Sequence, residues 1–190
     1  MVNSKLRASI ALSLMALLLS ACGACRKQTA PNANPSSAAN KSSPNTLPAS
    51  THGWTLENNQ RMTLANYQGK VVLLDFYATW CEPCRAETPH LVRLQQQYAD
   101  QGLQVIGLNV GGEDDRAEVP AYAKEFSIQY PLGFPEDELV DDYLSDNQNI
   151  PQTFVFDRSG KLVKRFVGYS EQSGQDLERV LQSTLAQNSQ

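Results

Sequence analysis

The fold of this chain is decided by one stretch, Val71-Val72-Leu73-Leu74-Asp75-Phe76-Tyr77-Ala78-Thr79-Trp80-Cys81-Glu82-Pro83-Cys84-Arg85. Its first eight residues are apolar except for Asp75, a pattern typical of a strand buried on both faces of a parallel sheet. Two cysteines, Cys81 and Cys84, then fall in what would be the first turn of a helix. Free backbone N–H groups at a helix start favour a thiolate, which is the nucleophile of disulfide exchange. The stretch therefore predicts a buried strand that leads into a redox-active cysteine pair.

Two blocks of sequence resemble the thioredoxin superfamily, and within it the membrane-tethered TlpA/ResA-like thiol–disulfide oxidoreductases. The blocks are residues 75–89, which contain the cysteine pair, and residues 150–161, which contain Pro151. The resemblance covers roughly residues 51–190 and implies a thioredoxin-like α/β fold. In that fold a central mixed sheet is flanked by helices, and a strand and a helix are inserted before a cis-proline, here Pro151. The resemblance also implies that no cofactor is needed beyond the redox-active Cys81–Cys84 disulfide.

Hydrophobic periodicity and turn residues place the elements of one α/β domain over residues 51–190. The helix that starts at Cys81 is expected to contain Pro89, which removes a hydrogen bond and bends the helix. The resemblance places the inserted strand and short helix between Tyr130 and Tyr143. The expected strands cover residues 54–56, 62–64, 71–78, 103–110, 153–156 and 162–167, and the other expected helices cover 81–99, 116–126 and 172–187.

The cysteine pair has two other interpretations. Structural zinc generally takes four protein ligands, and the two histidines of the chain, His52 and His90, do not form an H-x-x-x-H pattern. A purely structural disulfide is the second alternative. The strand before the pair and the proline block after it favour redox chemistry, so no metal is expected.

Each cysteine is expected to have its own role. Cys81 is predicted to have an exposed sulfur and to attack the substrate, while Cys84, one turn further in, resolves the mixed disulfide. Asp75 lies six residues before Cys81 in the apolar strand, where burial raises a carboxyl pKa and lets the group accept the Cys84 proton. Many thioredoxins pair such an acid with a lysine on the next strand, and the matching position here is Gly107. The alternative for Asp75 is an acid at the strand end that reaches solvent.

Four further residues are candidate parts of the site. Glu82, between the cysteines, disfavours the Cys81 thiolate and so favours a reductase over an oxidant, unless it is only a solvated surface acid. In the resembling family the backbone before Pro151 pairs with a substrate strand, so Ile150 is expected to shape substrate contact. An ordinary trans proline is the alternative. Trp80 is expected to be either an apolar rim for docking or a core tryptophan.

The N-terminus has the pattern of an export signal. Lys5 and Arg7 precede an apolar run, residues 10–19, that is too short to span a bilayer comfortably. The run leads into a Leu-Ser-Ala-Cys sequence similar to the bacterial lipobox, whose cysteine is acylated and becomes the first mature residue. We therefore expect residues 1–21 to be a lipoprotein signal peptide and Cys22 to be the lipid anchor. The alternative is a signal cut at a small-residue site, with Cys22 an ordinary thiol.

Residues 22–50 are rich in Pro, Asn, Ser and Ala and are expected to form a flexible tether between the anchor and the domain. Cys25, within the tether, could be a second acylated thiol, one partner of an intermolecular disulfide or a free bystander. Removal of residues 1–21 would leave 14 basic and 20 acidic residues. This acidic balance argues against nucleic-acid binding and gives anionic lipid little attraction, so membrane attachment would depend on acyl chains.

These features together predict a lipid-anchored thiol–disulfide oxidoreductase on the extracytoplasmic side of a bacterial membrane, with reduction favoured. The resemblance implies a membrane thiol transporter as electron donor, and disulfides of exported proteins such as apocytochrome c as substrates. A disulfide oxidase or isomerase on the same fold would differ in redox potential. A thiol peroxidase would place its nucleophile in a T-x-x-C pattern, whereas Thr79 lies only two residues before Cys81. A redox-inert binding domain is the non-enzymatic alternative.

Overall fold

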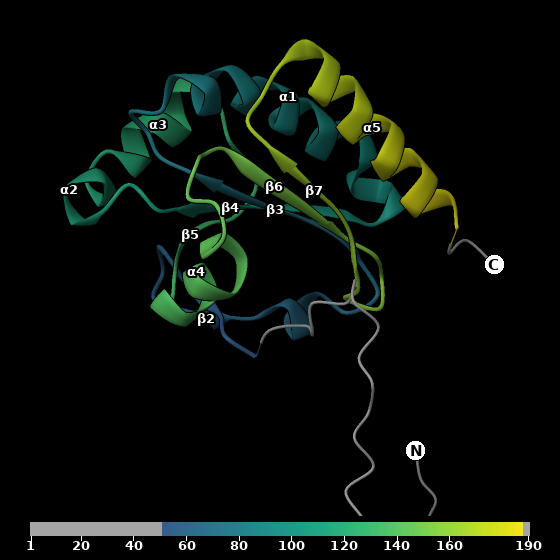
Figure 1. Ribbon diagram of the computed structural model, residues 1–190, viewed down its shortest axis with the longest axis horizontal. Helices are drawn as coiled ribbons and strands as arrows, with labels where there is room; N and C mark the ends of the chain where they lie inside the picture. The colour runs from purple at the N-terminus through teal and green to yellow at the C-terminus, as the bar shows by residue number, and fades with distance from the viewer. Residues whose placement is uncertain (1–50, 188–190) are drawn as a thin grey trace, which may run out of the picture. The chain divides into compact units, whose positions relative to one another are not determined.

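The computed structural model describes residues 51–187, and the predicted signal peptide, the lipid anchor Cys22 and the tether with Cys25 lie outside this range. The described residues form strands, α-helices and two short 3-10 helices, η1 and η2 (Figure 1). The strands are β1 (Trp54–Leu56), β2 (Arg61–Met62), β3 (Val71–Tyr77), β4 (Leu103–Asn109), β5 (Leu132–Pro135), β6 (Gln152–Phe156) and β7 (Leu162–Val167). The helices are η1 (Leu64–Tyr67), α1 (Glu82–Tyr98), η2 (Ala99–Gln101), α2 (Glu113–Arg116), α3 (Val119–Glu125), α4 (Asp137–Leu144) and α5 (Glu171–Ala186).

The strands form one mixed sheet in the order β2-β1-β5-β4-β3-β6-β7. Neighbours β3, β4 and β5 are parallel, β6 runs antiparallel to β3, and β7 pairs with β6 as a hairpin. The strand β5 and the helix α4 occupy the place before β6 where an inserted strand and helix were expected. The predicted mixed sheet, flanked by helices, is therefore confirmed.

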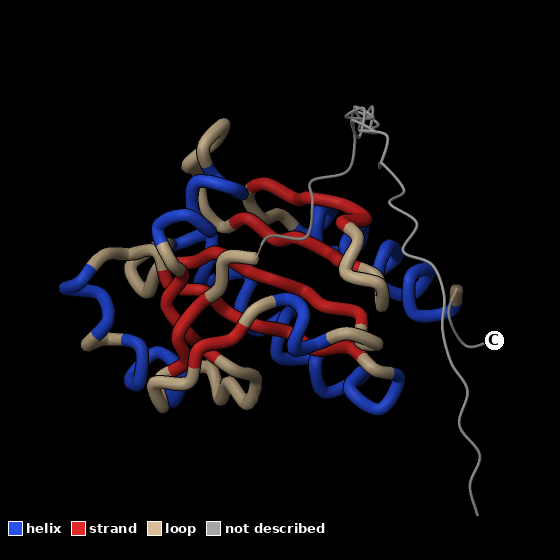
Figure 2. Tube along the Cα trace, turned by 90° about the horizontal axis from the view of Figure 1, so that it is seen from below, coloured by secondary structure: helices blue, strands red, loops and turns tan. Residues whose placement is uncertain are grey.

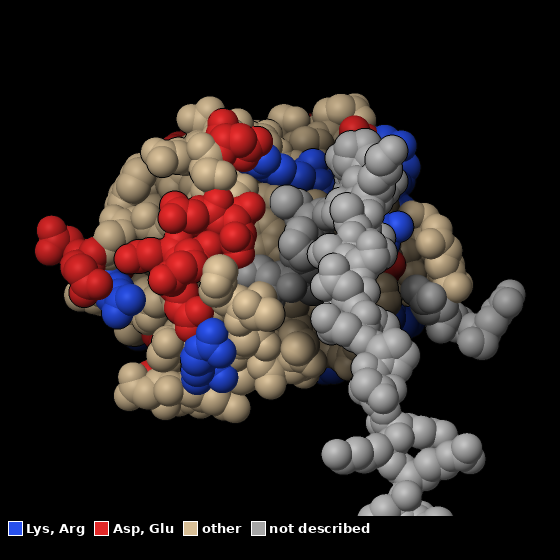
Figure 3. All heavy atoms as spheres, turned by 60° about the horizontal axis from the view of Figure 1, so that its bottom comes forward, with Lys and Arg blue, Asp and Glu red and all other residues tan. Residues whose placement is uncertain are grey.

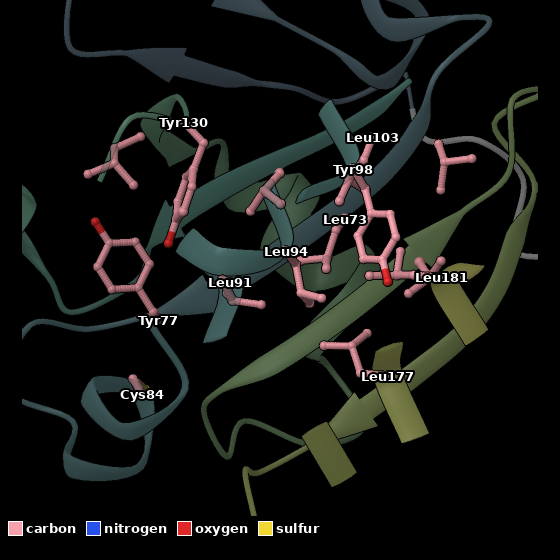
Figure 4. Close-up of a cluster of buried hydrophobic side chains, with 14 of the residues drawn as sticks. Leu73, Tyr77, Cys84, Leu91, Leu94, Tyr98, Leu103, Tyr130, Leu177 and Leu181 are labelled. Carbon is pink, nitrogen blue, oxygen red and sulfur yellow. The ribbon is translucent and has the colours of Figure 1, made fainter. Parts of the chain in front are cut away.

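Helices cover both faces of this sheet, whose strands make one continuous twisted layer (Figure 2). All seven residues of β3 are buried, and their side chains alternate between the two faces. On one face Leu73 packs in a cluster with Leu91 of α1 and Leu181 of α5 (Figure 4). On the other face Phe76 lies with its ring centroid 6.0 Å from that of Tyr143 in α4. The apolar run that opened the sequence is thus the centre of two cores, one on each side of β3.

The helix α1 starts immediately after β3 and the short loop that follows it. Cys81 is the N-cap residue, and Pro83 lies in the first turn, where a proline lacks only an N–H group that would have no helical partner. Pro89 lies inside the helix, as predicted. The buried face of α1 places Cys84 and Leu94 against the sheet.

Two predicted elements differ from the structure. The helix predicted over 116–126 is replaced by α3 (Val119–Glu125), while α2 (Glu113–Arg116) ends where the prediction began. Pro120 fits the first turn of α3, but it would interrupt the hydrogen bonds of a helix continuing from residue 116. The strand predicted over 62–64 ends at Met62, because Leu64 begins the 3-10 helix η1 and is buried there.

Acidic side chains gather on the molecular face shown in Figure 3. The helix α4 contributes four exposed acids, Asp137, Glu138, Asp141 and Asp142. Since α4 packs on the sheet face opposite α1, this acidic surface is separated from the cysteine pair by the sheet. Among residues 51–187, no helix has both the length and the apolar character needed to cross a membrane.

Candidate active site

The cysteine pair lies at the N-terminus of α1, the position predicted from the sequence. Cys81 and Cys84 are joined in a disulfide. As the N-cap residue, Cys81 accepts a hydrogen bond at its Sγ from the backbone N–H of Cys84, at 3.3 Å. In the reduced protein such a donor would favour a thiolate at Cys81, because a hydrogen bond to the charged form lowers a thiol pKa.

The predicted exposure of the Cys81 sulfur is wrong for this oxidised state. Cys81 is only 5% exposed, little more than Cys84 at 1%. The covering segment comes from 69 residues further along the chain, where the carbonyl oxygen of Ile150 lies 3.8 Å from the Cys81 Sγ. Trp80 projects beside the pair and is 67% exposed, so it forms an apolar rim and is not a core residue. A substrate would therefore approach Cys81 between this rim and the Ile150 segment.

The Ile150–Pro151 peptide bond is cis, so the alternative of an ordinary trans proline is wrong. The next residue, Gln152, is fully buried and holds the loop that leads to Ile150. Its side-chain Nε2 donates to the carbonyl oxygens of Asn147 at 2.6 Å and Asn149 at 2.7 Å. These bonds hold the backbone of the loop that places Ile150 opposite Cys81.

Two carboxyl groups are buried together behind the cysteines. Asp75 of β3 and Glu87 of α1 are each 3% exposed, so the alternative of a solvent-reaching acid at Asp75 is wrong. Thr153 connects them, because it pairs with Asp75 across β3 and β6 while its hydroxyl donates to Glu87 Oε1 at 2.9 Å. In the described structure Asp75 Oδ1 and Glu87 Oε2 have no hydrogen-bond partner.

This pair of acids is set up to exchange a proton near neutral pH. Burial raises the pKa of Asp75 well above its usual value, and the charge of Glu87 raises it further. Burial also raises the pKa of Glu87 to about 7, although the hydrogen bond from Thr153 acts in the opposite direction. Glu87 follows Cys84 by three residues on the same buried face of α1, so a proton leaving the Cys84 thiol has an acceptor close by.

The strand position paired with Asp75 is Gly107, as predicted from the sequence. A Cβ atom at residue 107 would lie 2.6 Å from Leu132 Cδ2 and 3.2 Å from Tyr77 Cε1, so the packing leaves no space for a lysine side chain. The absence of a cation at this position leaves the raised pKa of Asp75 without compensation from β4.

A third buried acid, Asp115, fixes the loop that precedes Cys81. Its carboxylate accepts hydrogen bonds from the Thr79 N–H at 2.9 Å, from the Thr79 hydroxyl and from Asn109 Nδ2 at 2.6 Å. Burial alone would raise the pKa of Asp115, but the bonds from Thr79 and Asn109 lower it below its usual value. Thr79 is also held through its carbonyl oxygen, which accepts a hydrogen bond from Arg85 Nη1 at 3.1 Å. The backbone two residues before Cys81 is thus held from both sides.

Glu87 and Asp115 were not predicted as site residues. A signal for Glu87 exists in the sequence, because an acid three residues after Cys84 falls on the helix face that must be buried. Asp115 carries no such signal, since its partner Thr79 lies 36 residues away and the two meet only through the pairing of β3 with β4.

Glu82 is exposed and is the first residue of α1, where a negative charge interacts favourably with the helix dipole. Its exposure fits a solvated surface acid, and its position next to Cys81 fits an acid that disfavours the Cys81 thiolate. A measured redox potential distinguishes these two interpretations, because only the second changes it. Within residues 51–187, no group of three or more His, Cys, Asp or Glu side chains is arranged to hold a metal ion.

The Glu87→Gln substitution is expected to change how stability depends on pH. Because the Glu87 pKa is raised to about 7, the folded protein binds more protons than the unfolded chain between the two pKa values, and its stability falls as pH rises through that window. One such proton gives a slope of at most about 1.4 kcal/mol per pH unit. Urea unfolding between about pH 5 and about pH 8 should show a smaller slope in Glu87→Gln, while the exposed control Glu138→Gln keeps the wild-type slope. Equal slopes in Glu87→Gln and wild type would contradict the assignment.

The profile of the AhpC/TSA family matches residues 46–165 of this chain. The thiol-disulfide oxidoreductase ResA of Bacillus subtilis is 32% identical over 117 residues, which make up 61% of this chain and 63% of that protein. The thioredoxin-like protein YneN of the same organism is 33% identical over 112 residues, 58% of this chain and 64% of that protein. The matched region thus spans just under two thirds of each of these relatives.

Solved structures show the same architecture. A thiol:disulfide interchange protein of the thioredoxin family from Chlorobium tepidum has a TM-score of 0.60 at 28% identity, covering 70% of this chain and 94% of that one. A thiol:disulfide interchange protein from a Bacteroides species has a TM-score of 0.59 at 22% identity, covering 73% and 88%, and this likeness shows the fold alone. By its sequence match and its fold, the chain belongs to the AhpC/TSA family of thioredoxin-like proteins.

Proposed function

We propose that this protein is a thiol–disulfide oxidoreductase that reduces disulfides in other proteins. The observation that carries the proposal is the Cys81–Cys84 disulfide at the start of α1, backed by the buried carboxyls of Asp75 and Glu87. A purely structural disulfide would need no proton acceptor behind it, whereas disulfide exchange requires one each time a thiol attacks. The names of ResA and of the Chlorobium interchange protein support the same reaction class.

The reaction is a pair of exchange steps. In the reduced protein the Cys81 thiolate attacks one sulfur of the substrate disulfide, forms a mixed disulfide, and releases a substrate thiolate that takes a proton from water. Cys84 then gives its proton to the Asp75–Glu87 pair and attacks the Cys81 sulfur, which releases the second substrate thiolate. Two electrons have moved to the substrate, and the Cys81–Cys84 disulfide is left. A thiol donor restores the dithiol by the reverse exchange.

Reduction is favoured over oxidation by the charges around Cys81. Strong oxidants stabilise their reduced form with a very low thiolate pKa, which cationic neighbours provide. Here the residue after Cys81 is an acid, Glu82, and no lysine or histidine stands between the cysteines. The Cys81 thiolate is therefore less favoured than in an oxidant. A disulfide oxidase or isomerase is the alternative, and a measured redox potential would distinguish it.

Peroxide chemistry is disfavoured by the hydrogen bonds of Thr79. A T-x-x-C peroxidase would need the threonine three residues before its nucleophile, and Thr79 lies two before Cys81. The Thr79 hydroxyl also donates its hydrogen bond to the Asp115 carboxylate, so that proton is already used and is not offered to a peroxide. A peroxide-consumption assay with a thiol reductant separates the two activities, and the reductase assignment expects no turnover.

The proposed location is the extracytoplasmic side of a bacterial membrane, with lipid attached to Cys22 and residues 22–50 as a tether. Support comes from the lipobox-like sequence after a short apolar run. A diacyl anchor would be enough for stable attachment, because each buried CH₂ contributes about 0.8 kcal/mol. The proposed electron donor is a membrane thiol transporter, and the proposed substrates are disulfides of exported proteins such as apocytochrome c.

The redox potential of the pair is expected to lie below about −200 mV, nearer to thioredoxin than to a strong oxidant. Equilibration with dithiothreitol or glutathione buffers measures it. The Glu82→Gln substitution should raise the potential, because removing the charge favours the thiolate and hence the reduced form. The exposed control Glu138→Gln, on the opposite sheet face, should leave it unchanged. A wild-type potential above about −150 mV would assign the protein to the oxidases instead.

The Asp75→Asn substitution is expected to slow exchange about 10²-fold or more at neutral pH, because Cys84 loses a proton acceptor. The loss should shrink at alkaline pH, where hydroxide takes the proton from the Cys84 thiol without help from the carboxyl. Stopped-flow reduction of a peptide disulfide at several pH values tests this, with the exposed acid Asp141→Asn as the control. A rate equal to wild type at every pH would remove Asp75 from the mechanism.

The Cys22→Ala substitution is expected to release the protein from membranes, because the acylated residue is lost. Fractionation and incorporation of a labelled fatty acid measure the effect, and Cys25→Ala, three residues away, is the matched control. If the Cys22→Ala protein stays with membranes and the wild type takes up no label, the lipid anchor is disproved.

A further inference from the structure

His90 of α1 is a buried titratable residue that the proposed reaction leaves unused. It is 5% exposed, and within the described structure neither ring nitrogen has a hydrogen-bond partner. Glu178 of α5 pairs with it as a salt-bridge partner, with Oε2 3.8 Å from Nε2, beyond hydrogen-bond distance. A buried polar group without a partner costs about 1–3 kcal/mol, so such groups are rare without a functional reason.

The neighbouring helix is shaped to admit this histidine. Gly174 lies inside α5, and a Cβ atom there would be 2.8 Å from His90 Nδ1 and 3.0 Å from its Cε1. A glycine within a helix is less stable than alanine by about 0.5–1 kcal/mol. Two features that weaken the fold therefore meet at the His90 ring.

A pocket of about 280 Å³ lies between α1 and α5 and is called here the α1–α5 pocket. His90 and Arg93 line it from α1, Tyr169 lies at its edge, and Glu171 and Glu178 line it from α5. Its volume and polar lining suit several water molecules. The His90 ring thus stands between the interior of the protein and a polar pocket at its surface.

His90 lies one helical turn after Glu87, a member of the buried carboxyl pair, and both belong to the buried face of α1. Glu87 and His90 occupy positions i and i+3 of α1, which places their Cβ atoms about 5–6 Å apart on one face. Burial raises the pKa of Tyr169, and the charge of Glu87 adds to this effect. The Tyr169 and His90 ring centroids are 6.1 Å apart. His90 is thus the residue that lies both one turn from Glu87 on α1 and in the lining of the α1–α5 pocket.

We propose that His90 carries the proton between Glu87 and the water of the α1–α5 pocket. Its role in turnover rests on the proposed function, in which the buried acids take one proton from Cys84 in every cycle and must release it before the next. One ring nitrogen accepts the proton from the Glu87 carboxyl, directly or through water, and the other gives its proton to pocket water. The step leaves the imidazole neutral, transfers no electrons and regenerates the carboxylate.

The surroundings of His90 keep its ring neutral, which a relay needs because only the neutral ring has both a donor and an acceptor nitrogen. Burial lowers the His90 pKa, the Arg93 charge lowers it further, and Glu178 offsets part of this shift. The other titratable groups near the ring are Tyr169, which is neutral near pH 7, and Glu87, one turn earlier on α1.

The direct test follows the proton on Glu87 without requiring catalysis. After a jump from about pH 6 to about pH 8, across the Glu87 pKa, time-resolved infrared spectroscopy of the oxidised full-length protein records the loss of a carboxyl C=O band that Glu87→Gln identifies. The decay of this band should be slower by a factor of about ten or more in His90→Ala. The same slowing is expected in His90→Gln, which retains a polar side chain of similar size. His52→Ala, at the other histidine, should match the wild type.

Chemical rescue separates a relay from a packing role. Imidazole added to His90→Ala should restore the decay rate, whereas pyrazole, a ring of the same size but a far weaker base, should not. Equal decay in wild type and both His90 variants, or equal rescue by pyrazole, would overturn the proposal. Turnover is measured in parallel with a peptide disulfide and dithiothreitol. A wild type with no turnover defeats the proposed function and leaves the infrared result standing, while normal turnover with unchanged band decay defeats the relay alone.

Discussion

The burial of two carboxyl groups side by side, Asp75 and Glu87, is the constraint on which the rest of the site depends. Two acids that share a low-dielectric space cannot both ionise cheaply, so the pair holds a proton near neutral pH. This arrangement arises because β3 and α1 are packed tightly around Thr153, which bonds to one acid and pairs in the sheet with the other. Cys84 sits on the same helix face and shares this environment. The Cys81–Cys84 disulfide therefore lies next to two carboxyl groups that can accept and release a proton near neutral pH.

The fold supports this site by fixing every segment that reaches it. Asp115 holds the loop before Cys81 through Thr79, and Gln152 holds the loop that carries the cis-proline. These are buried, hydrogen-bonded polar contacts, which define a geometry more strictly than apolar packing does. By contrast, the acids and His90 retain unpaired polar atoms. Hydrogen bonds therefore fix the backbone around the cysteines, whereas the groups proposed to carry protons keep polar atoms without partners.

Much of this structure could be predicted from local sequence. The apolar run of β3 and the cysteine spacing identify the strand and the helix start, and the burial of Asp75 follows from its place inside the run. The errors came from contacts between distant segments. Cys81 is covered by Ile150, 69 residues away, which no local pattern encodes. The roles of Glu87 and His90 likewise depend on partners in β6 and α5. The predicted helix over 116–126 is a different case, because Pro120, a local signal inside it, marks where α3 begins.

The most direct test of this account is mass spectrometry of mixed disulfides formed with a peptide disulfide. The account assigns attack on the substrate to Cys81 and resolution to Cys84. The Cys84→Ala protein, once reduced, should accumulate a one-to-one adduct linked through Cys81, because the resolving thiol is missing. The Cys81→Ala protein should accumulate far less, because Cys84 is the more deeply buried thiol. Equal adduct in both proteins, or an adduct found mainly on Cys84, would contradict the assignment.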